Sequence, residues 1–213
     1  CDSVQISTNQ VEHHRDGIYL EFTDNSVIDQ NFSRNNLRYG LHFMFSNNDL
    51  YHNNTFSKNG AGVAVMFSDH IKMTGNHFLE NWGRASYGLL LKEIYDSQIK
   101  GNTFEKNTTG IFSEGSSRIA FEANHFKANG WAIRMRGSSM DNEISFNHIS
   151  EIGLGTLSDM GCVYSLGSFA TGRNATQTRI ANNVCHNVSV YNYGGAAGRW
   201  ARGGREGWRR DRG

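Results

Sequence analysis

The sequence predicts an all-β protein that folds as a single-stranded right-handed parallel β-helix of about seven to eight coils, with ~22 residues in each coil. Three observations predict this solenoid: a short phrase that returns at a nearly constant interval, a strand-like alternation after each copy, and an unusual set of turn residues. The 213 residues include 23 Asn and 24 Gly but no Pro. Asn and Gly tolerate left-handed backbone, so the chain can turn often without proline. Leucine-rich and other helical repeats are disfavoured, because no helical period is present.

The repeated phrase is an apolar residue, two or three small or polar residues, Asn, any residue, and a second apolar residue. Its clearest copies are MTGNHFLEN, IKGNTFEKN and FEANHFKAN, which end at Asn81, Asn107 and Asn129. Equivalent corners are expected at positions 9, 30, 54, 76, 102, 124, 147 and 183, and six of the seven intervals lie between 21 and 26 residues. We expect the Asn side chains at these corners to adopt the left-handed bend and to hydrogen bond along the stack.

A strand is expected after each copy of the phrase. Gly followed by alternating apolar and variable residues reads GIYLEF from Gly17, GLHFMF from Gly40, GVAVMF from Gly62 and GLLLKE from Gly88. An alternation with period two places one set of side chains inside and the other outside. Two inward columns are predicted: Ile18, Leu41, Val63, Leu89, Ile111 and Ile133, and then Leu20, Phe43, Val65 and Leu91. An internal aromatic stack is predicted from Phe32, Phe56, Phe78, Phe104 and Phe126.

The domain organisation follows from where the repeat is interrupted. Residues 1–193 are expected to form the β-helix, with a loop-rich insertion at 153–177. Residues 194–213 form a Gly/Arg-rich tail in which six arginines and two acidic residues give a net charge of +4. The tail lacks the repeat and any aromatic spacing for bases, so we interpret it as a disordered or non-native terminus rather than an arm for nucleic acid. No apolar run reaches the ~18 residues of a membrane span.

The outward positions of the strands carry the candidate metal ligands. One outward column is expected to contain Tyr19, His42, Ala64, Leu90, Phe112 and Arg134, and the next Glu21, Met44, Met66, Lys92, Glu114 and Arg136. Met44 and Met66 are thus expected to be neighbours on adjacent coils and to face solvent, with His42 two residues along the same strand. Two thioethers and an imidazole suit a soft ion, Cu(I) above all. The alternative is an apolar contact surface that the two Met form with Phe45 and Phe67.

Other polar residues support weaker hypotheses. His77, His125 and His148 each follow a ladder Asn and are expected to point outward, either as solvated turn residues or as a corner metal site. A carbohydrate-active β-helix would need paired carboxylates or a calcium-binding cluster, and the outward acids are scattered among columns. For that alternative, Asp159 and Tyr164 in the insertion are the candidate groove residues, and calcium is the alternative cofactor.

Five ordered segments carry a resemblance to a known family: RDGIYLEF from Arg15, YGLHFMFS from Tyr39, NGAGVAVMFSDHI from Asn59, YGLLLKE from Tyr87 and NGWAIRMRGS from Asn129. They closely resemble the NosD family, periplasmic factors needed to mature nitrous oxide reductase, a copper enzyme. The likeness covers about residues 1–142. It implies a non-enzymatic periplasmic β-helix that works transiently with copper, docks onto a membrane ABC transporter and exchanges with a copper chaperone. Met44 and Met66 lie inside the matched segments, but their role rests on the column argument.

Residues 143–193 depart from that family. The segments NHISEIGLGTLSDMGCVYSLG and NNVCHNVSVYNYGG resemble secreted β-helix proteins of the glycoside-hydrolase and polysaccharide-lyase type. Proteins of that type typically have an acidic loop at the place where this chain has Gly198, Arg199 and Trp200. The missing carboxylates argue against hydrolase activity. The change of pattern indicates a chimeric or frame-disturbed C-terminus. The cysteines Cys1, Cys162 and Cys185 allow one disulfide at most. The chain begins at Cys1 without a leader, which predicts a removed leader or a fragment.

Overall fold

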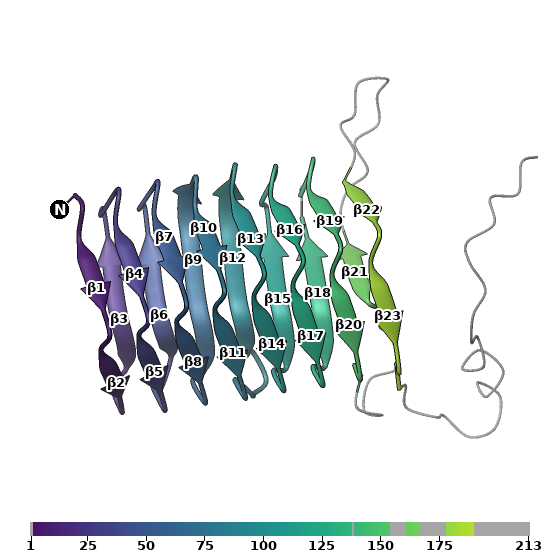
Figure 1. Ribbon diagram of the computed structural model, residues 1–213, viewed down its shortest axis with the longest axis horizontal. Coiled ribbons are helices and arrows are strands. Elements are labelled where there is room, and N and C mark those ends of the chain that lie inside the picture. Colours follow the sequence, from purple (N-terminus) through teal and green to yellow (C-terminus); the bar gives the residue numbers. More distant parts are fainter. Residues whose placement is uncertain (1, 138, 154–160, 167–177, 190–213) are drawn as a thin grey trace, which may run out of the picture.

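The computed structural model describes residues 2–137, 139–153, 161–166 and 178–189. The predicted tail at 194–213, most of the predicted insertion at 153–177, and the candidate residue Asp159 lie outside the described residues. Short strands at a repeating spacing form three parallel sheets (Figure 1). Each of the first seven coils contributes one strand to each sheet, and the described part of the eighth coil contributes one strand to each of the first two sheets. The arrangement is the predicted right-handed parallel β-helix.

The three sheets run along the stack from the first coil to the last. The first sheet contains β1 (Gln5–Ser7), β4 (Val27–Asp29), β7 (Leu50–His52), β10 (Lys72–Thr74), β13 (Gln98–Lys100), β16 (Ala120–Glu122), β19 (Glu143–Ser145) and β22 (Arg179–Ala181). The second sheet contains β2 (Gln10–Glu12), β5 (Phe32–Arg34), β8 (Thr55–Ser57), β11 (His77–Leu79), β14 (Thr103–Glu105), β17 (His125–Lys127), β20 (His148–Ser150) and β23 (Val184–His186). The third sheet contains β3 (Asp16–Glu21), β6 (Tyr39–Met44), β9 (Ala61–Asp69), β12 (Tyr87–Tyr95), β15 (Thr109–Glu114), β18 (Trp131–Arg136) and β21 (Val163–Leu166).

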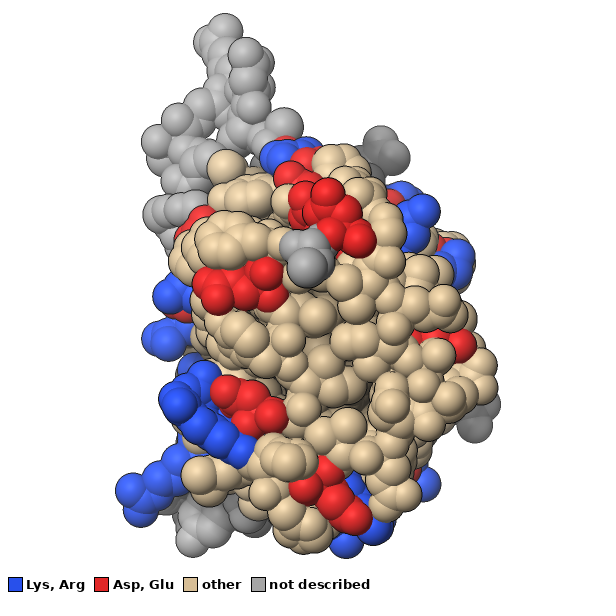
Figure 2. All heavy atoms as spheres, turned by 90° about the vertical axis from the view of Figure 1, so that its left-hand side faces the viewer, with Lys and Arg blue, Asp and Glu red and all other residues tan. Residues whose placement is uncertain are grey.

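The interior consists of the apolar columns that the alternation predicts. Every member of the two predicted inward columns is buried, with Ile18 and Leu20 of the first coil the most exposed, at 8% each. Figure 2 looks along the stack at this first coil, where uncharged surface fills most of the face and Lys and Arg lie at its margins. Parallel in-register pairing brings each apolar residue onto its equivalent, so burial is continuous along the axis.

Buried Asn side chains join the coils at one corner. Oδ1 of Asn54 accepts the backbone N–H of Asn31 at 2.9 Å and its Nδ2–H at 3.0 Å, and Asn54 donates in the same way to Asn76. The ladder confirms that Asn side chains hydrogen bond along the stack. Its second-coil member is Asn31, not residue 30 as the repeat predicts, and the left-handed bend falls on the residue before each ladder Asn, as at Gln30 with φ of 53°.

The same one-residue shift corrects the predicted aromatic stack. Phe32 pairs with Thr55, whereas Ser33 takes the buried place opposite Phe56 and donates to the carbonyl of Gly40 at 2.8 Å. A shift of one residue turns a strand side chain to the other face, so Phe32 lies outside the stack. The stack therefore starts one coil later, with ring centroids 5.6, 4.5 and 4.9 Å apart along Phe56, Phe78, Phe104 and Phe126.

Candidate functional site

Met44 and Met66 are direct partners in the parallel pairing of β6 with β9. Both side chains are half-buried on the outer face of the third sheet. Glu21 precedes them in the column and Lys92 follows them. Neighbouring coils are about 4.8 Å apart, a spacing that lets two thioether sulfurs reach one ion. The two candidate ligands thus lie in the register that the repeat predicts.

His42 lies on the same face, two residues before Met44, but it is covered rather than open to solvent. The rings of Tyr19 and Tyr39 lie 5.1 and 4.8 Å from the imidazole, which is only 6% exposed. Neither ring nitrogen has a hydrogen-bond partner among the described residues. Burial lowers the pKa of His42, against the raising effect of Asp16. The imidazole is therefore neutral at neutral pH and keeps a free lone pair, which is the form that binds metals.

Three exposed aromatic rings stand directly beyond the methionines. Phe22, Phe45 and Phe67 are 65%, 39% and 43% exposed, and their stacked rings have centroids 5.0 and 5.2 Å apart. Each adopts a left-handed φ between 49° and 54°, a conformation that is rare for a bulky residue. These three residues are here called the Phe ladder. Two of them, Phe45 and Phe67, belong to the apolar contact surface that is the alternative role for Met44 and Met66. The ladder and the methionines lie side by side, so one partner can contact both.

The corner that carries the Phe ladder changes character farther along the stack. Its equivalent positions hold Glu93 and then Gly115 and Gly137, all with positive φ. Two adjoining hollows of about 420 and 580 Å³ lie over this part of the corner, and both are lined by Lys92, Glu93 and Tyr95. The carboxylate of Glu93 lies over Gly115, where a side chain would otherwise stand. The corner is therefore raised and aromatic on the first three coils, and hollowed and charged on later ones.

The carbohydrate alternative rests on Tyr164, which pairs with Arg134 across β18 and β21. The Arg134 guanidinium lies 4.9 Å from the Trp131 ring, 5.8 Å from that of Phe112 and 5.9 Å from that of Tyr164. No carboxylate within the described part of the chain forms an ion pair with Arg134. The sequence reasoning did not select Trp131 and Arg134 for this site. Arg134 stands in the predicted outward column, whereas the alternation places Trp131 in phase with the inward Ile133.

Two of the corner histidines lie on adjacent coils as direct neighbours, and a third histidine joins them. His125 and His148 are partners in the pairing of β17 with β20, and His186 of β23 reaches His148 from the next coil. His77 has threonine neighbours instead. His186 was missed because Val184 holds its coil's equivalent position, yet the period-two spacing from 184 to 186 was a usable signal. In the described residues, no three His, Cys, Asp or Glu side chains converge to hold a metal ion.

A disulfide joins Cys162 to Cys185, with the two Cα atoms 6.3 Å apart. It is the single bridge that the cysteine count allows, and it fastens β23 to the preceding coil.

Among the described residues, no helix could span a membrane.

Solved structures that share this architecture include two mannuronan C-5 epimerase modules and an alginate lyase. The A-module of the Azotobacter vinelandii mannuronan C-5 epimerase AlgE4 has a TM-score of 0.66 at 17% identity and covers 89% of this chain. The corresponding module of AlgE6 has a TM-score of 0.64 at 12% identity, again over 89% of this chain. This chain spans 58% of each of those structures. An alginate lyase from Paenibacillus, at 8% identity and a TM-score of 0.61, covers 87% of this chain and is itself covered over 90% of its length. At these low sequence identities, the structural similarity shows a shared fold and nothing further.

The family comparison bears on the sequence itself. No curated protein matches the chain significantly. The model of a family described as periplasmic copper-binding protein (NosD) matches residues 2–152, which extends the expected resemblance by ten residues at its C-terminal end and includes Met44, Met66 and His42. This match spans well over half of the 213 residues. The chain therefore belongs to the NosD family of periplasmic copper-binding proteins.

Proposed function

We propose that this chain is a non-enzymatic periplasmic accessory protein that carries Cu(I) transiently as cargo during assembly of the copper site of nitrous oxide reductase. The observation that carries the proposal is the in-register pair Met44 and Met66, which lies inside the segment matched by the family model. His42 on the same strand supplies a neutral imidazole without a hydrogen-bond partner among the described residues.

The donor set fits a cargo ion that must be released. Thioethers are soft, uncharged ligands that select Cu(I) over Zn(II) and Ca(II). Met44 and Met66 both bind the ion from the outer face of the sheet. The side of the ion that faces solvent therefore stays open to an incoming ligand. His42 binds only when Tyr19 or Tyr39 shifts, because those two rings cover the imidazole. Two or three neutral ligands on an open face favour exchange over permanent retention.

The proposed docking surface for a partner protein lies on the same outer face as Met44 and Met66. A copper chaperone that docks on the Phe ladder would bring its own ligands next to Met44 and Met66, so Cu(I) can pass without entering solvent. A membrane ABC transporter is the second proposed partner, because the resemblance to the NosD family implies one. The Cys162–Cys185 disulfide supports a periplasmic location, because disulfides persist in oxidising compartments.

Titration of Cu(I) against a competing chelator tests the cargo site. The wild-type protein is expected to take up one Cu(I) with sub-micromolar affinity, and the double variant Met44→Ala/Met66→Ala is expected to lose that uptake. Met140→Ala is the matched control, because Met140 is 41% exposed and lies on another coil. Unchanged stoichiometry and affinity in the double variant would eliminate the thioether site.

The second candidate function is a carbohydrate-active protein of the polysaccharide-lyase or glycoside-hydrolase type. Its support is the grouping of Arg134 with Trp131 and Tyr164, a cation framed by rings on the outer face. Tyr164 and Asp159 are its proposed catalytic residues and calcium its proposed cofactor. Uronate-containing and neutral polysaccharides are the substrates to screen, with and without calcium. Absence of turnover with every substrate would end this alternative.

A further inference from the structure

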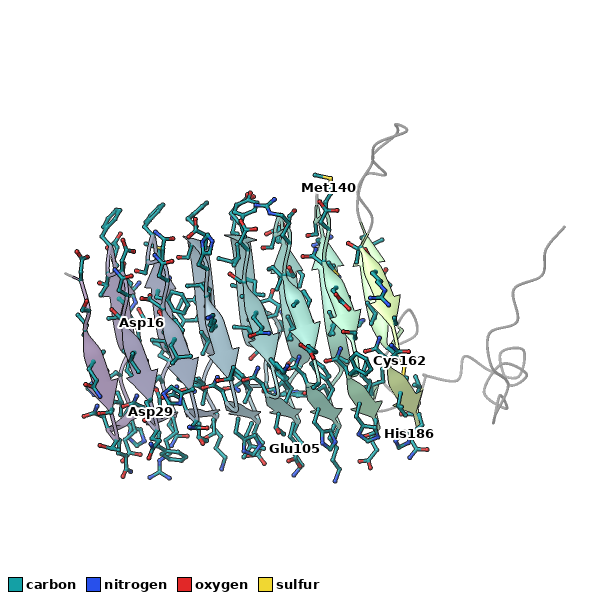
Figure 3. All side chains as sticks on the ribbon, turned by 45° about the horizontal axis from the view of Figure 1, so that its top comes forward. Asp16, Asp29, Glu105, Met140, Cys162 and His186 are labelled. Carbon is teal, nitrogen blue, oxygen red and sulfur yellow. A yellow bond between two sulfur atoms is a disulfide. The ribbon has the colours of Figure 1, made fainter. Side chains whose placement is uncertain are left out.

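Three histidines form a continuous row on the last three coils. Nε2 of His125 lies 3.3 Å from Nδ1 of His148, and Nε2 of His148 lies 3.0 Å from Nε2 of His186. His125 and His148 stand in register on adjacent strands, whereas His186 lies two residues beyond Val184, the strand partner of His148. Figure 3 labels His186 at the C-terminal end of the stack, close to Cys162. The Cys162–Cys185 disulfide holds the strand that carries His186.

The two contacts constrain the protonation of the row. Each nitrogen–nitrogen contact needs one N–H donor and one lone pair, and a neutral imidazole offers one of each. His148 can therefore donate to one neighbour and accept from the other while all three rings stay neutral. Burial lowers the pKa of His148, and the two neighbouring imidazoles lower it further. An arrangement with three neutral rings thus satisfies both contacts, and the neutral imidazole is the form that binds metal ions.

The two contacts differ in kind. The 3.0 Å separation between His148 and His186 is an ordinary hydrogen-bond length, whereas the 3.3 Å separation between His125 and His148 is long for one. Two imidazole nitrogens that bind one ion at about 2.0–2.1 Å lie roughly 2.9–3.4 Å apart for right-angled to tetrahedral geometry. The longer contact thus matches two ligands of a single ion.

We propose that His125 Nε2 and His148 Nδ1 bind one divalent d-block cation, Zn(II) or Cu(II), with water completing its coordination. In this arrangement Nε2–H of His148 donates to Nε2 of His186. His186 is then a positioning residue, because a metal-bound histidine is oriented by the acceptor of its other N–H. Two imidazoles and water are consistent with the absence of a converging group of three donors among the described residues.

This inference does not rest on the proposed Cu(I) cargo. The thioether pair lies on the third sheet at the second and third coils, whereas the histidine row lies on the second sheet at the sixth to eighth coils. Thioethers select Cu(I), whereas imidazoles take Zn(II) and Cu(II). Met44→Ala/Met66→Ala should leave the imidazole site intact, so failure of one proposal is distinguishable from failure of the other.

Zn(II) calorimetry and Cu(II) electron paramagnetic resonance on the full chain, with its disulfide intact, test the site. One tight Zn(II) per chain is expected, and His125→Ala or His148→Ala should abolish it. Bound Cu(II) should couple to two imidazole nitrogens in the wild type. His77→Ala is the matched control, because His77 occupies the same repeat position between Thr55 and Thr103.

The role of His186 has a readout of its own. His186→Ala should weaken Zn(II) binding by about 10-fold to 100-fold while the Cu(II) spectrum still reports two nitrogens. His186→Gln should restore much of the affinity, because an amide oxygen can accept the N–H of His148. The proposal is overturned if His125→Ala keeps wild-type affinity, if His77→Ala weakens binding equally, or if His186→Ala removes one of the two coupled nitrogens.

Discussion

The hydroxyl of Tyr51 donates a 2.9 Å hydrogen bond to Oδ2 of Asp49 inside the solenoid, where both side chains are fully buried. Oδ1 of the same carboxyl group accepts the backbone N–H of Ser26 at 2.7 Å. Burial raises the pKa of Asp49 from an ordinary value of 3.8 to about 6, although both hydrogen bonds act in the opposite direction. The ionised form of this side chain therefore opposes folding near neutral pH.

Asp49→Asn is expected to make the protein more stable at pH 7. Because the folded pKa of Asp49 lies above its unfolded value, its stabilising contribution is full below pH 3.8, falls as the pH rises to about 6, and stays low above that. The free energy of unfolding of the variant, minus that of the wild type, should therefore rise between pH 4 and 6 and then level off. Urea denaturation across this range measures it.

Asn142 provides the matched comparison, because its Oδ1 accepts the N–H of Ile119 at 2.9 Å at the equivalent place of a later coil. Asn142→Asp should introduce a pH dependence of the same sign as that of Asp49. A difference between Asp49→Asn and the wild type that does not change with pH would contradict the assignment.

Gly88→Ala is expected to destabilise the solenoid. A Cβ at this position would lie 2.7 Å from the carbonyl oxygen of Gly110 and 2.9 Å from Cδ1 of Phe104, so the backbone of the next coil must move. Overpacking of this kind costs about 1–3 kcal/mol in the free energy of unfolding. Gly83→Ala is the control, since its added carbon meets Ser86 Cβ at an ordinary 3.5 Å. Equal stability of the two variants in urea denaturation would show that the neighbouring coil can accommodate a Cβ at position 88.

Asn76→Ala is expected to be among the costlier single changes. Asn76 Oδ1 accepts from the backbone and side chain of Asn54, and its Nδ2–H groups donate to the carbonyl of Tyr51 and to Asn102. Removal leaves several buried groups without partners, at about 1–3 kcal/mol for each group. Thermal and urea denaturation measure the loss, with the exposed Lys72→Ala of the same coil as control. A loss no larger than that of Lys72→Ala would show that the ladder does not hold the coils together.

Phe45→Asn is expected to separate docking from stability. Asn tolerates the left-handed φ of 49° that Phe45 adopts, so the relief of backbone strain should offset the lost ring stacking and leave the free energy of unfolding within about 1 kcal/mol. Transfer of Cu(I) from a chaperone should nevertheless slow, because the Phe ladder is interrupted. Phe78→Ala, in the internal stack, should cost about 3–5 kcal/mol by contrast. Unchanged transfer by the folded Phe45→Asn protein would remove the ladder from the proposed docking surface.

The sequence was most informative where a residue's neighbours are copies of itself. Period-two alternation correctly placed Ile18, Leu41 and Val63 in one buried column and Met44 beside Met66. These predictions succeed because parallel coils in register put equivalent positions on top of one another, so a linear spacing becomes a spatial contact. The copper-binding role of the methionines remains a prediction, since register alone does not bind an ion.

One error shows the limit of a local pattern. The segment at 30–33 fits the repeat in two phases, one that puts Phe32 inside and one that puts Ser33 inside. Apolar character favoured Phe32, yet Ser33 is the residue opposite Phe56. In the phase that the structure adopts, Asn31 takes the ladder position and donates two hydrogen bonds to Oδ1 of Asn54.

The sequence by itself determined the solenoid, the faces of its strands and the family of the chain. Only the tertiary structure decided how accessible the outward residues are: it covers His42 with Tyr19 and Tyr39, and it brings His186 to His148 across an interval that breaks the repeat. The physical reason is that periodicity fixes the direction of a side chain from its own backbone. Cover and contact depend on the rotamers and lengths of residues on other coils, whose positions no local spacing encodes.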